Sequence, residues 1–302
     1  MIICPLISGS SGNATYVASG ETRILVDCGG SGVQIEKAMR SIGADPSRLD
    51  AILVTHSHTD HIKGLGVLAR RYRVPLHASV GTWEEIQRRN KIGVVPGKQL
   101  KIFQTGAARE IRFESIVVKA FSTPHDADDS VGYVFSDGQT SFGLATDIGS
   151  VTRDIRAALL GCDYVLLEAN YDEKMLWEGP YPYPLKKRIA GPKGHLSNAE
   201  AAKFAVELLK NGAQTILLGH LSEHNNTPSI AYKTVSAAIS KAGLDITRQP
   251  VYMTRRHEPS RLLKTEAPKK LTTEAPEKPR EVRQKVFFPF GRRRCELKTS
   301  DA

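Results

Sequence analysis

The sequence predicts an α/β fold in which two β-sheets pack together and helices cover their outer faces. Short apolar runs rich in branched residues alternate with runs whose apolar residues recur at three- and four-residue spacing. The strand-like runs come first in pairs and later alternate with helix-like runs, a pattern typical of layered folds. Gly and Pro separate these runs up to residue 261, where the composition changes. We therefore expect one domain at 1–261 and a disordered tail at 262–302.

The apolar patterns predict these elements in order along the chain. Strands are expected near 2–6, 14–19, 22–27, 51–55, 163–168 and 214–219, with several more between 100 and 145. Helices are expected near 33–42, 64–73, 81–90, 152–160, 198–210 and 228–242.

The stretch VTHSHTDHIKG, residues 54–64, holds three of the nine histidines of the chain and one Asp. It follows the apolar run 51–55, which is typical of a strand buried on both faces. Ligand sites in layered α/β folds lie at such strand ends. Neutral imidazoles and carboxylates are ligands of zinc, manganese and iron. Because His56 and His58 occupy alternate positions, they can point the same way and bind one ion.

Three more polar residues end apolar runs. His125 follows SIVVKAF, Asp147 lies directly after TSFGLAT, and His220 follows TILL by two residues. A site for two ions needs more ligands than one loop supplies, and these residues are the candidates.

The pattern H-x-H-x-D-H, followed by a lone His, a lone Asp and a lone His, resembles the metallo-β-lactamase superfamily of binuclear hydrolases. The resemblance implies a four-layer αββα sandwich with two divalent metal ions, zinc or manganese with iron as an alternative, in a cleft at one edge of the sheets. The implied ligands are, for the first ion, His56, His58 and His125; for the second ion, Asp60, His61 and His220; and for both ions, together with a bridging hydroxide, Asp147.

Three further stretches resemble the YycJ (WalJ) branch of this superfamily. They are PLISGSSGNATYV, EANYDEKMLWEGPYPYPLKKRI, and GPKGHLSNAEAAKFA with the later GHLSEHNNTP. This resemblance implies a DNA exonuclease acting on single-stranded ends. The chain departs from the expected Asn-His-Asp, because it has Asn170, Tyr171 and Asp172 at those positions. The role of Tyr171 is therefore open.

Two residues are candidates for proton transfer and positioning. Asp60 can orient the attacking hydroxide as well as bind metal. His195 precedes the predicted helix 198–210, in which Ser197 and Glu200 form a capping box. The cap does not require His195, and in related nucleases a His in a similar segment lies beside the scissile phosphate. We therefore expect His195 to be catalytic; the alternatives are support of a ligand and a surface role.

The loop SGSSGN follows the strand-like IICPLI and is the predicted substrate contact. Gly- and Ser-rich turns expose backbone N–H groups, which can bind anions. We place at the rim of the cleft, in contact with phosphate, the residues Ser8, Ser10, Ser11 and Asn13. The alternative is a tight turn between strands. Asp27 either orients a metal-binding His or caps a loop.

Composition limits the class of protein. The four cysteines have no C-x-x-C spacing, which indicates reduced thiols rather than a disulfide framework or a zinc ribbon. No apolar run approaches the ~18 residues of a membrane span, and no basic segment precedes an apolar one at the start. We expect a cytoplasmic protein that does not enter a membrane.

The tail is basic, with 12 Lys or Arg against 6 Asp or Glu from Arg261 to Ala302, whereas the whole chain has a net charge of +10. Such a tail suits non-specific binding of nucleic acid, and the alternative is a solubilising role. The segment Gln284–Phe290, QKVFFPF, resembles peptides that dock on sliding clamps, which suggests a protein partner.

Three functional hypotheses follow. The first is a binuclear metal-dependent phosphodiesterase or nuclease, specifically an exonuclease on single-stranded DNA. The second is a small-molecule phosphodiesterase, a glyoxalase-II-like thioesterase or an RNA-processing nuclease of the same fold. The third is a metal-stabilised binding protein without activity, which the complete ligand set argues against. The sequence leaves open the native metal, the polarity of cutting and the oligomeric state.

Overall fold

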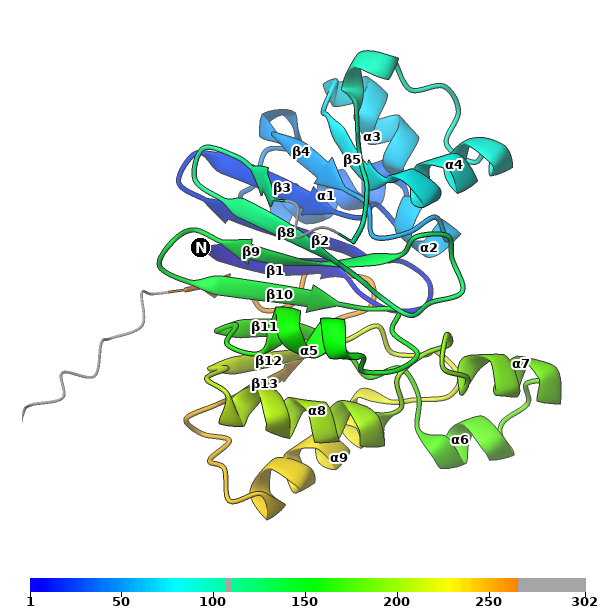
Figure 1. Ribbon diagram of the computed structural model, residues 1–302, viewed down its shortest axis with the longest axis vertical. Coiled ribbons are helices and arrows are strands. Elements are labelled where there is room, and N and C mark those ends of the chain that lie inside the picture. Colours follow the sequence, from blue (N-terminus) through cyan, green and yellow to red (C-terminus); the bar gives the residue numbers. More distant parts are fainter. Residues whose placement is uncertain (107–109, 266–302) are drawn as a thin grey trace, which may run out of the picture. The chain divides into compact units, whose positions relative to one another are not determined.

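Two mixed seven-stranded sheets form the centre of the computed structural model, which describes residues 1–106 and 110–265 (Figure 1). The first sheet has, in spatial order, β14 (Leu263–Lys264), β1 (Ile2–Ile7), β2 (Ala14–Ser19), β3 (Thr22–Val26), β4 (Ala51–Leu53), β5 (Leu76–Ser79) and β6 (Leu100–Phe103). The second has β13 (Val251–Met253), β12 (Thr215–Gly219), β11 (Tyr164–Glu168), β10 (Ser141–Ala145), β9 (Val131–Ser136), β8 (Val117–Ser122) and β7 (Glu110–Arg112).

The strands divide their apolar side chains between two layers because successive residues point to opposite faces. In β4, Ala51 and Leu53 belong to the core between the sheets, whereas Ile52 belongs to the core under the helices. Tyr133 and Phe135 of β9 fill the layer between the sheets. Strands buried on both faces therefore appear in the sequence as continuous apolar runs.

Helices cover the outer face of each sheet. Beside the first sheet lie α1 (Gly32–Ser41), α3 (Leu65–Tyr72) and α4 (Val80–Arg89), and beside the second lie α5 (Arg153–Leu159), α8 (Asn198–Lys210) and α9 (Pro228–Lys241) (Figure 1). The predicted αββα four-layer sandwich is confirmed.

One of the two hydrogen bonds of the predicted capping box of α8 is present, because the Ser197 hydroxyl accepts from the backbone N–H of Glu200. The Glu200 carboxylate pairs instead with Lys203.

Parallel pairing brings the carboxyl ends of several strands to the same edge. Strands β3 to β6 run parallel in the first sheet, and strands β10 to β13 do so in the second. Side chains that follow these strands can therefore meet at one edge of the sandwich. The short helix α2 (Thr59–Ile62) lies just after β4 at that edge.

Several elements were not predicted. They are the helices α6 (Glu173–Glu178) and α7 (Tyr183–Ile189), the strands β13 and β14, the helix α2, and two 3-10 turns at Pro46–Arg48 and Gly97–Gln99. Strand β14 lies beyond the predicted boundary at residue 261, and its Leu263 pairs with Ile3 of β1. The predicted docking segment at Gln284–Phe290 lies outside the described residues.

Two composition-based expectations can be compared with the described part of the chain. None of its helices is long and apolar enough to cross a membrane. Its three cysteines, Cys4, Cys28 and Cys162, are free and buried.

Candidate metal centre

The structure brings all seven predicted ligands together at the shared edge of the sheets. Four come from the loop after β4 and helix α2, and three follow β8, β10 and β12. They fall into overlapping groups whose ligand atoms lie within 4.8 Å of one another: His56, His58 and His125; Asp60, His61 and His220; and His56, His61 and Asp147. Segments as far apart in the sequence as those of His56 and His220 therefore build one cluster.

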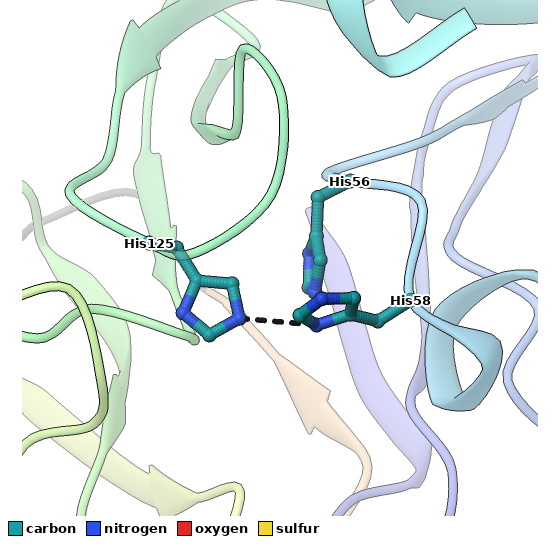
Figure 2. A group of neighbouring side chains, drawn as sticks. All are labelled: His56, His58 and His125. Atoms are coloured by element: carbon teal, nitrogen blue, oxygen red, sulfur yellow. Dashed lines mark hydrogen bonds between the residues drawn. The ribbon is translucent and has the colours of Figure 1, made fainter. Parts of the chain in front are cut away.

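The first group is three imidazole rings that face one another (Figure 2). Nδ1 of His58 lies 3.2 Å from Nε2 of His125. The ring of His56 lies 4.7 Å from that of His58 and 4.8 Å from that of His125, in edge-on arrangements. Three imidazole nitrogens directed at one point are a typical donor set for a divalent metal ion.

The second group combines two imidazoles with a carboxylate. Oδ2 of Asp60 lies 3.5 Å from Nε2 of His61 and 3.6 Å from Nε2 of His220. Asp147 contacts both groups, because its Oδ2 lies 3.1 Å from Nε2 of His61 and its Oδ1 lies 3.7 Å from Nε2 of His125. Its position between the groups is the one expected of a bridging ligand.

Three buried atoms in this cluster lack a hydrogen-bond partner within the described residues. They are Nε2 of His56, Nε2 of His220 and Oδ2 of Asp147. A buried polar atom without a partner destabilises a fold by about 1–3 kcal/mol. Divalent cations bound between the groups would satisfy all three atoms at once. The donor set of imidazoles and carboxylates without thiolates suits zinc, manganese or iron, so a binuclear His/Asp metal-site geometry is present.

The rings are held from behind by oxygen atoms. Nδ1 of His61 lies 2.8 Å from the Asp27 carboxylate, and Nδ1 of His125 lies 3.1 Å from the carbonyl of Gly194. These contacts leave the other ring nitrogen directed into the cluster, as is usual for metal-binding histidines. Asp27 therefore contacts a histidine of the cluster, as the first of its two interpretations requires. The same carboxylate also accepts from the backbone N–H of Thr55 at 2.8 Å.

Strain is concentrated at three of these strand ends. Asp27, Asp147 and His220 have φ values of 61°, 56° and 54°, in the left-handed region that residues other than Gly seldom adopt. Each follows a strand directly or by one residue, and the turn directs its side chain to the cluster. Such conformations persist only where surrounding contacts impose them, and they are commonest at functional sites.

Glu168 is a buried carboxylate in the cluster that sequence analysis missed. Its Oε1 lies 2.8 Å from Nδ1 of His195 and 2.9 Å from Nδ1 of His220, and its Oε2 accepts from the backbone N–H groups of Ile148 and Leu196. Burial would raise the pKa of Glu168, but the two histidines lower it overall. Glu168 ends the strand-like run YVLLE, which is the same signal that identified His125 and Asp147.

The predicted catalytic residue His195 lies beside the metal-binding cluster. Its side chain is 22% exposed and its ring lies 5.3 Å from His125 and 5.4 Å from His220. Burial would lower the pKa of His195, but the Glu168 and Asp147 carboxylates together raise it. Because Glu168 faces Nδ1, the other ring nitrogen is left for a substrate.

A cavity of about 250 Å³ opens directly onto this cluster. Its lining includes residues of α7 and its preceding loop, together with His58, Asp60, Asp147, His195 and His220. Asp126, which sequence analysis also missed, lies here with its Oδ1 3.4 Å from Nε2 of His125. Its other oxygen pairs with Arg188 of α7 at 2.5 Å. A substrate in this cavity would contact both the cluster and α7.

A family model described as the beta-lactamase superfamily domain matches residues 22–221. The chain belongs to the metallo-β-lactamase superfamily. With its seven ligands assembled, it is a metal-dependent hydrolase.

Two curated relatives match over most of their length. Exodeoxyribonuclease WalJ of Streptococcus pneumoniae is 39% identical over 241 residues, which cover 80% of this chain and 89% of that protein. Exodeoxyribonuclease YycJ of Bacillus anthracis is 36% identical over 241 residues, which cover 80% of this chain and 90% of that protein. The family assignment therefore extends to this branch of the superfamily.

Solved structures of lower identity share the fold. The metallo-beta-lactamase fold protein YhfI of Bacillus subtilis has a TM-score of 0.63 at 18% identity, covering 86% of this chain and 100% of that chain. Zn(2+)-bound PqqB of Methylobacterium extorquens has a TM-score of 0.64 at 14% identity, with the same coverage.

The predicted rim loop is only partly at the rim. Ser10 and Ser11 are exposed, and Ser10 lines the cavity. For Ser8 and Asn13 the prediction is wrong, because both side chains are buried. The Ser8 hydroxyl accepts from the backbone N–H of His220, and Nδ2 of Asn13 lies 3.1 Å from Nε2 of His61. The Asn13 amide also bonds both backbone groups of Gly9, which closes the turn inward.

Tyr171 lies outside the cavity. It is 6% exposed and forms a backbone bridge with Ser197 at the start of α8, and burial raises the pKa of its hydroxyl to about 12. The neighbouring Asn170 does line the cavity, with Nδ2 3.2 Å from Nδ1 of His220. The departure from the branch pattern at Tyr171 therefore leaves the described ligand cluster complete.

Proposed function

We propose that this chain is a metal-dependent exodeoxyribonuclease that hydrolyses phosphodiester bonds at single-stranded DNA ends. The observation that carries the proposal is the match over 241 residues to two proteins named exodeoxyribonucleases, together with the seven predicted ligands that the structure assembles in one cluster. A fold match alone would not support a substrate, because this fold serves many chemistries.

In this proposal two divalent ions occupy the two groups. His56, His58 and His125 would hold one ion; Asp60, His61 and His220 would hold the other; and Asp147, which contacts histidines of both groups, would be shared between them. Such ions lower the pKa of bound water and stabilise the attacking and leaving oxygens of a displacement at phosphorus. Zinc and manganese are the candidate ions, and iron fits the same donors.

Two side chains of this centre would orient the attacking water and supply the proton for the leaving oxygen. Asp60 is 25% exposed at its side chain and faces the cavity, where its second oxygen can orient the attacking water. His195 supplies the proton that the leaving oxygen requires, because Glu168 fixes Nδ1 and raises the pKa of the ring. Glu168 also contacts His220, so one carboxylate positions both a ligand and the acid.

The exposed Ser10 is the part of the 8–13 loop that can contact a phosphate group at the cavity. We propose the same for Ser11 beside it. Ser8 instead accepts from the backbone N–H of His220, and Asn13 lies beside Nε2 of His61, the ring nitrogen that faces the cluster.

RNA and small phosphodiesters are the competing substrates. The match to Ribonuclease Z of Bradyrhizobium is 29% identical and covers 39% of this chain and 42% of that protein, which is far shorter than the exodeoxyribonuclease matches. We therefore favour DNA.

The test is a comparison of substrates at one metal concentration. Purified protein with Mn²⁺ or Zn²⁺ is given single-stranded DNA, RNA of the same sequence, a cyclic nucleotide and a thioester. We expect DNA to have the highest kcat/KM, with all activity lost in His58→Ala. A higher kcat/KM for one of the other substrates, equally dependent on His58, would overturn the DNA assignment and keep the hydrolase.

A further inference from the structure

Helices α6 and α7, with the segment that leads from them to His195, form a projection that we call the arm, residues 173–194. It is inserted between β11 and α8, beyond the strand ends, whereas α8 and α9 cover the sheet (Figure 1). Helix α7 has no buried residue. Folding of the sandwich does not explain such a helix, because most helices are stabilised by burying one face.

The arm forms one wall of the cavity at the metal centre. Tyr181, Leu185, Arg188 and Ile189 line that wall, and His58 and His220 also line the cavity. The arm is also fixed at its base: Arg188 pairs with Asp126 beside His125, and the Gly194 carbonyl contacts the His125 ring. A Cβ at Gly194 would lie 2.2 Å from the carbonyl oxygens of Arg188 and Ile189, so only glycine allows this approach. The arm is therefore fixed in position relative to the predicted ligands.

The outer part of the arm exposes two aromatic side chains. Trp177 is 45% exposed and Tyr183 is 61% exposed, and their ring centroids lie 6.3 Å apart. The pair is held by the Lys186 ammonium, which donates to the Trp177 carbonyl. Large exposed aromatic rings are unusual on a surface that has no partner, and they offer flat faces for stacking.

The arm is also basic. It carries five Lys or Arg against two Glu, and Lys186, Lys187 and Arg188 are consecutive in the last turn of α7. The Lys187 ammonium lies 4.9 Å from the centroid of the Tyr183 ring. Positive charge interleaved with exposed aromatic rings is the composition of surfaces that bind single-stranded nucleic acid.

We propose that the arm is the surface along which a single strand of nucleic acid lies when its terminal phosphodiester enters the cavity. Bases stack on Trp177 and Tyr183, while Lys186 and Lys187 neutralise phosphates. A single strand fits better than a duplex, because paired bases hide their faces from these rings. This inference rests on the proposed nuclease function and adds the surface that recognises the strand.

The test compares a long strand with a short one. The double variant Trp177→Ala/Tyr183→Ala is assayed on oligothymidylate of about 20 nucleotides and on the thymidine dinucleotide. The matched control is Tyr232→Ala/Lys233→Gln, which changes an exposed Tyr and its neighbouring Lys on α9. We expect the preference for the long strand, as the ratio of kcat/KM values, to fall about 10-fold or more in the arm variant alone. The reason is that each base stacked on an aromatic ring strengthens binding by about this factor.

Three results separate the two proposals. An unchanged preference in the arm variant, with DNA still degraded, would overturn the role of the arm and leave the nuclease standing. Failure of the unaltered protein to cleave either substrate would overturn the nuclease and the arm together.

In Lys186→Gln/Lys187→Gln, the slope of log KM against log salt should fall by about 1.4, because single strands give about 0.7 per phosphate contact. An unchanged slope would contradict the phosphate contacts.

Discussion

At the scale of single residues, Glu168 joins the predicted ligand His220 to the proposed proton donor His195. It is 0% exposed, yet it accepts from two backbone N–H groups and contacts two histidine rings. Burial would lower the pKa of His220, but Asp147, Asp60 and Glu168 together raise it to about 10. A bound cation would displace that proton, so binding of metal to this cluster releases protons.

Substitution Glu168→Gln should weaken metal binding without unfolding the protein. The amide keeps the shape of the side chain but loses the negative charge that orients His220. Support of this kind typically contributes 10–100-fold to metal affinity. Titration with a metal buffer and elemental analysis would measure the change. Equal affinity in wild type and variant would show that Glu168 has no part in the centre.

Substitution His195→Ala should separate catalysis from metal binding. We expect kcat to fall about 10²–10⁴-fold, as is typical for loss of a general acid, while metal content is unchanged. His58→Ala provides the comparison, because it should lose both. Turnover at the wild-type rate in His195→Ala would remove His195 from the mechanism.

At the scale of elements, β5 contains a histidine whose protonation in acid should destabilise the fold. His77 is half-buried with its ring 5.7 Å from that of Phe113. Burial, with a smaller contribution from Lys101, lowers the pKa of His77 to about 4. The folded-state pKa of His77 lies below the unfolded value of about 6.5, so protonation of this side chain favours the unfolded state. His77 therefore does not reduce the unfolding free energy above pH 6.5. It reduces the unfolding free energy progressively as the pH falls from 6.5 towards 4.

Substitution His77→Phe should therefore reduce the loss of stability in acid. Between pH 7 and pH 5 the wild type should lose about 2 kcal/mol more of its unfolding free energy than the variant. Urea unfolding at both pH values measures the difference, and the same change at the exposed His257 is the control. If wild type and His77→Phe lose stability equally, the burial argument for β5 fails.

Elements were predictable where many residues repeat one pattern. The long helices α8 and α9 have periodic apolar faces and Ser or Thr caps, and β1 to β3 are apolar runs ended by turn residues. Helix α7 escaped prediction because it has no buried face, and β14 because it has two residues and depends on pairing with β1.

The ligands were predictable because each follows a strand, but the sequence does not say which carboxylate is buried. Glu168 and the inward closure of the 8–13 loop therefore had to come from the structure.

At the scale of the whole described domain, the centre joins the two sheets. His56, His58, Asp60 and His61 follow β4 of the first sheet, whereas His125, Asp147 and His220 follow strands of the second. The same edge holds three nearly unexposed carboxylates: Asp27, Asp147 and Glu168. Buried negative charge destabilises a fold unless cations compensate for it.

Removal of metal should therefore lower the thermal stability of the protein. A ligand at about 100 times its Kd stabilises the folded state by about 2.7 kcal/mol. For a domain of this size that corresponds to about 5–10 °C in Tm. Calorimetry with and without a chelator would measure it, and His58→Ala should respond less. A Tm independent of metal would contradict an ion shared between the sheets.

The proposed activity of this cluster is metal-dependent degradation of DNA from an end. The most direct measurement is a time course on end-labelled single-stranded DNA with Mn²⁺ or Zn²⁺, comparing wild type with His58→Ala. We predict progressive shortening by the wild type alone, with the position of the label giving the polarity. Intact DNA in the presence of wild-type protein shown to contain bound metal would contradict the claim.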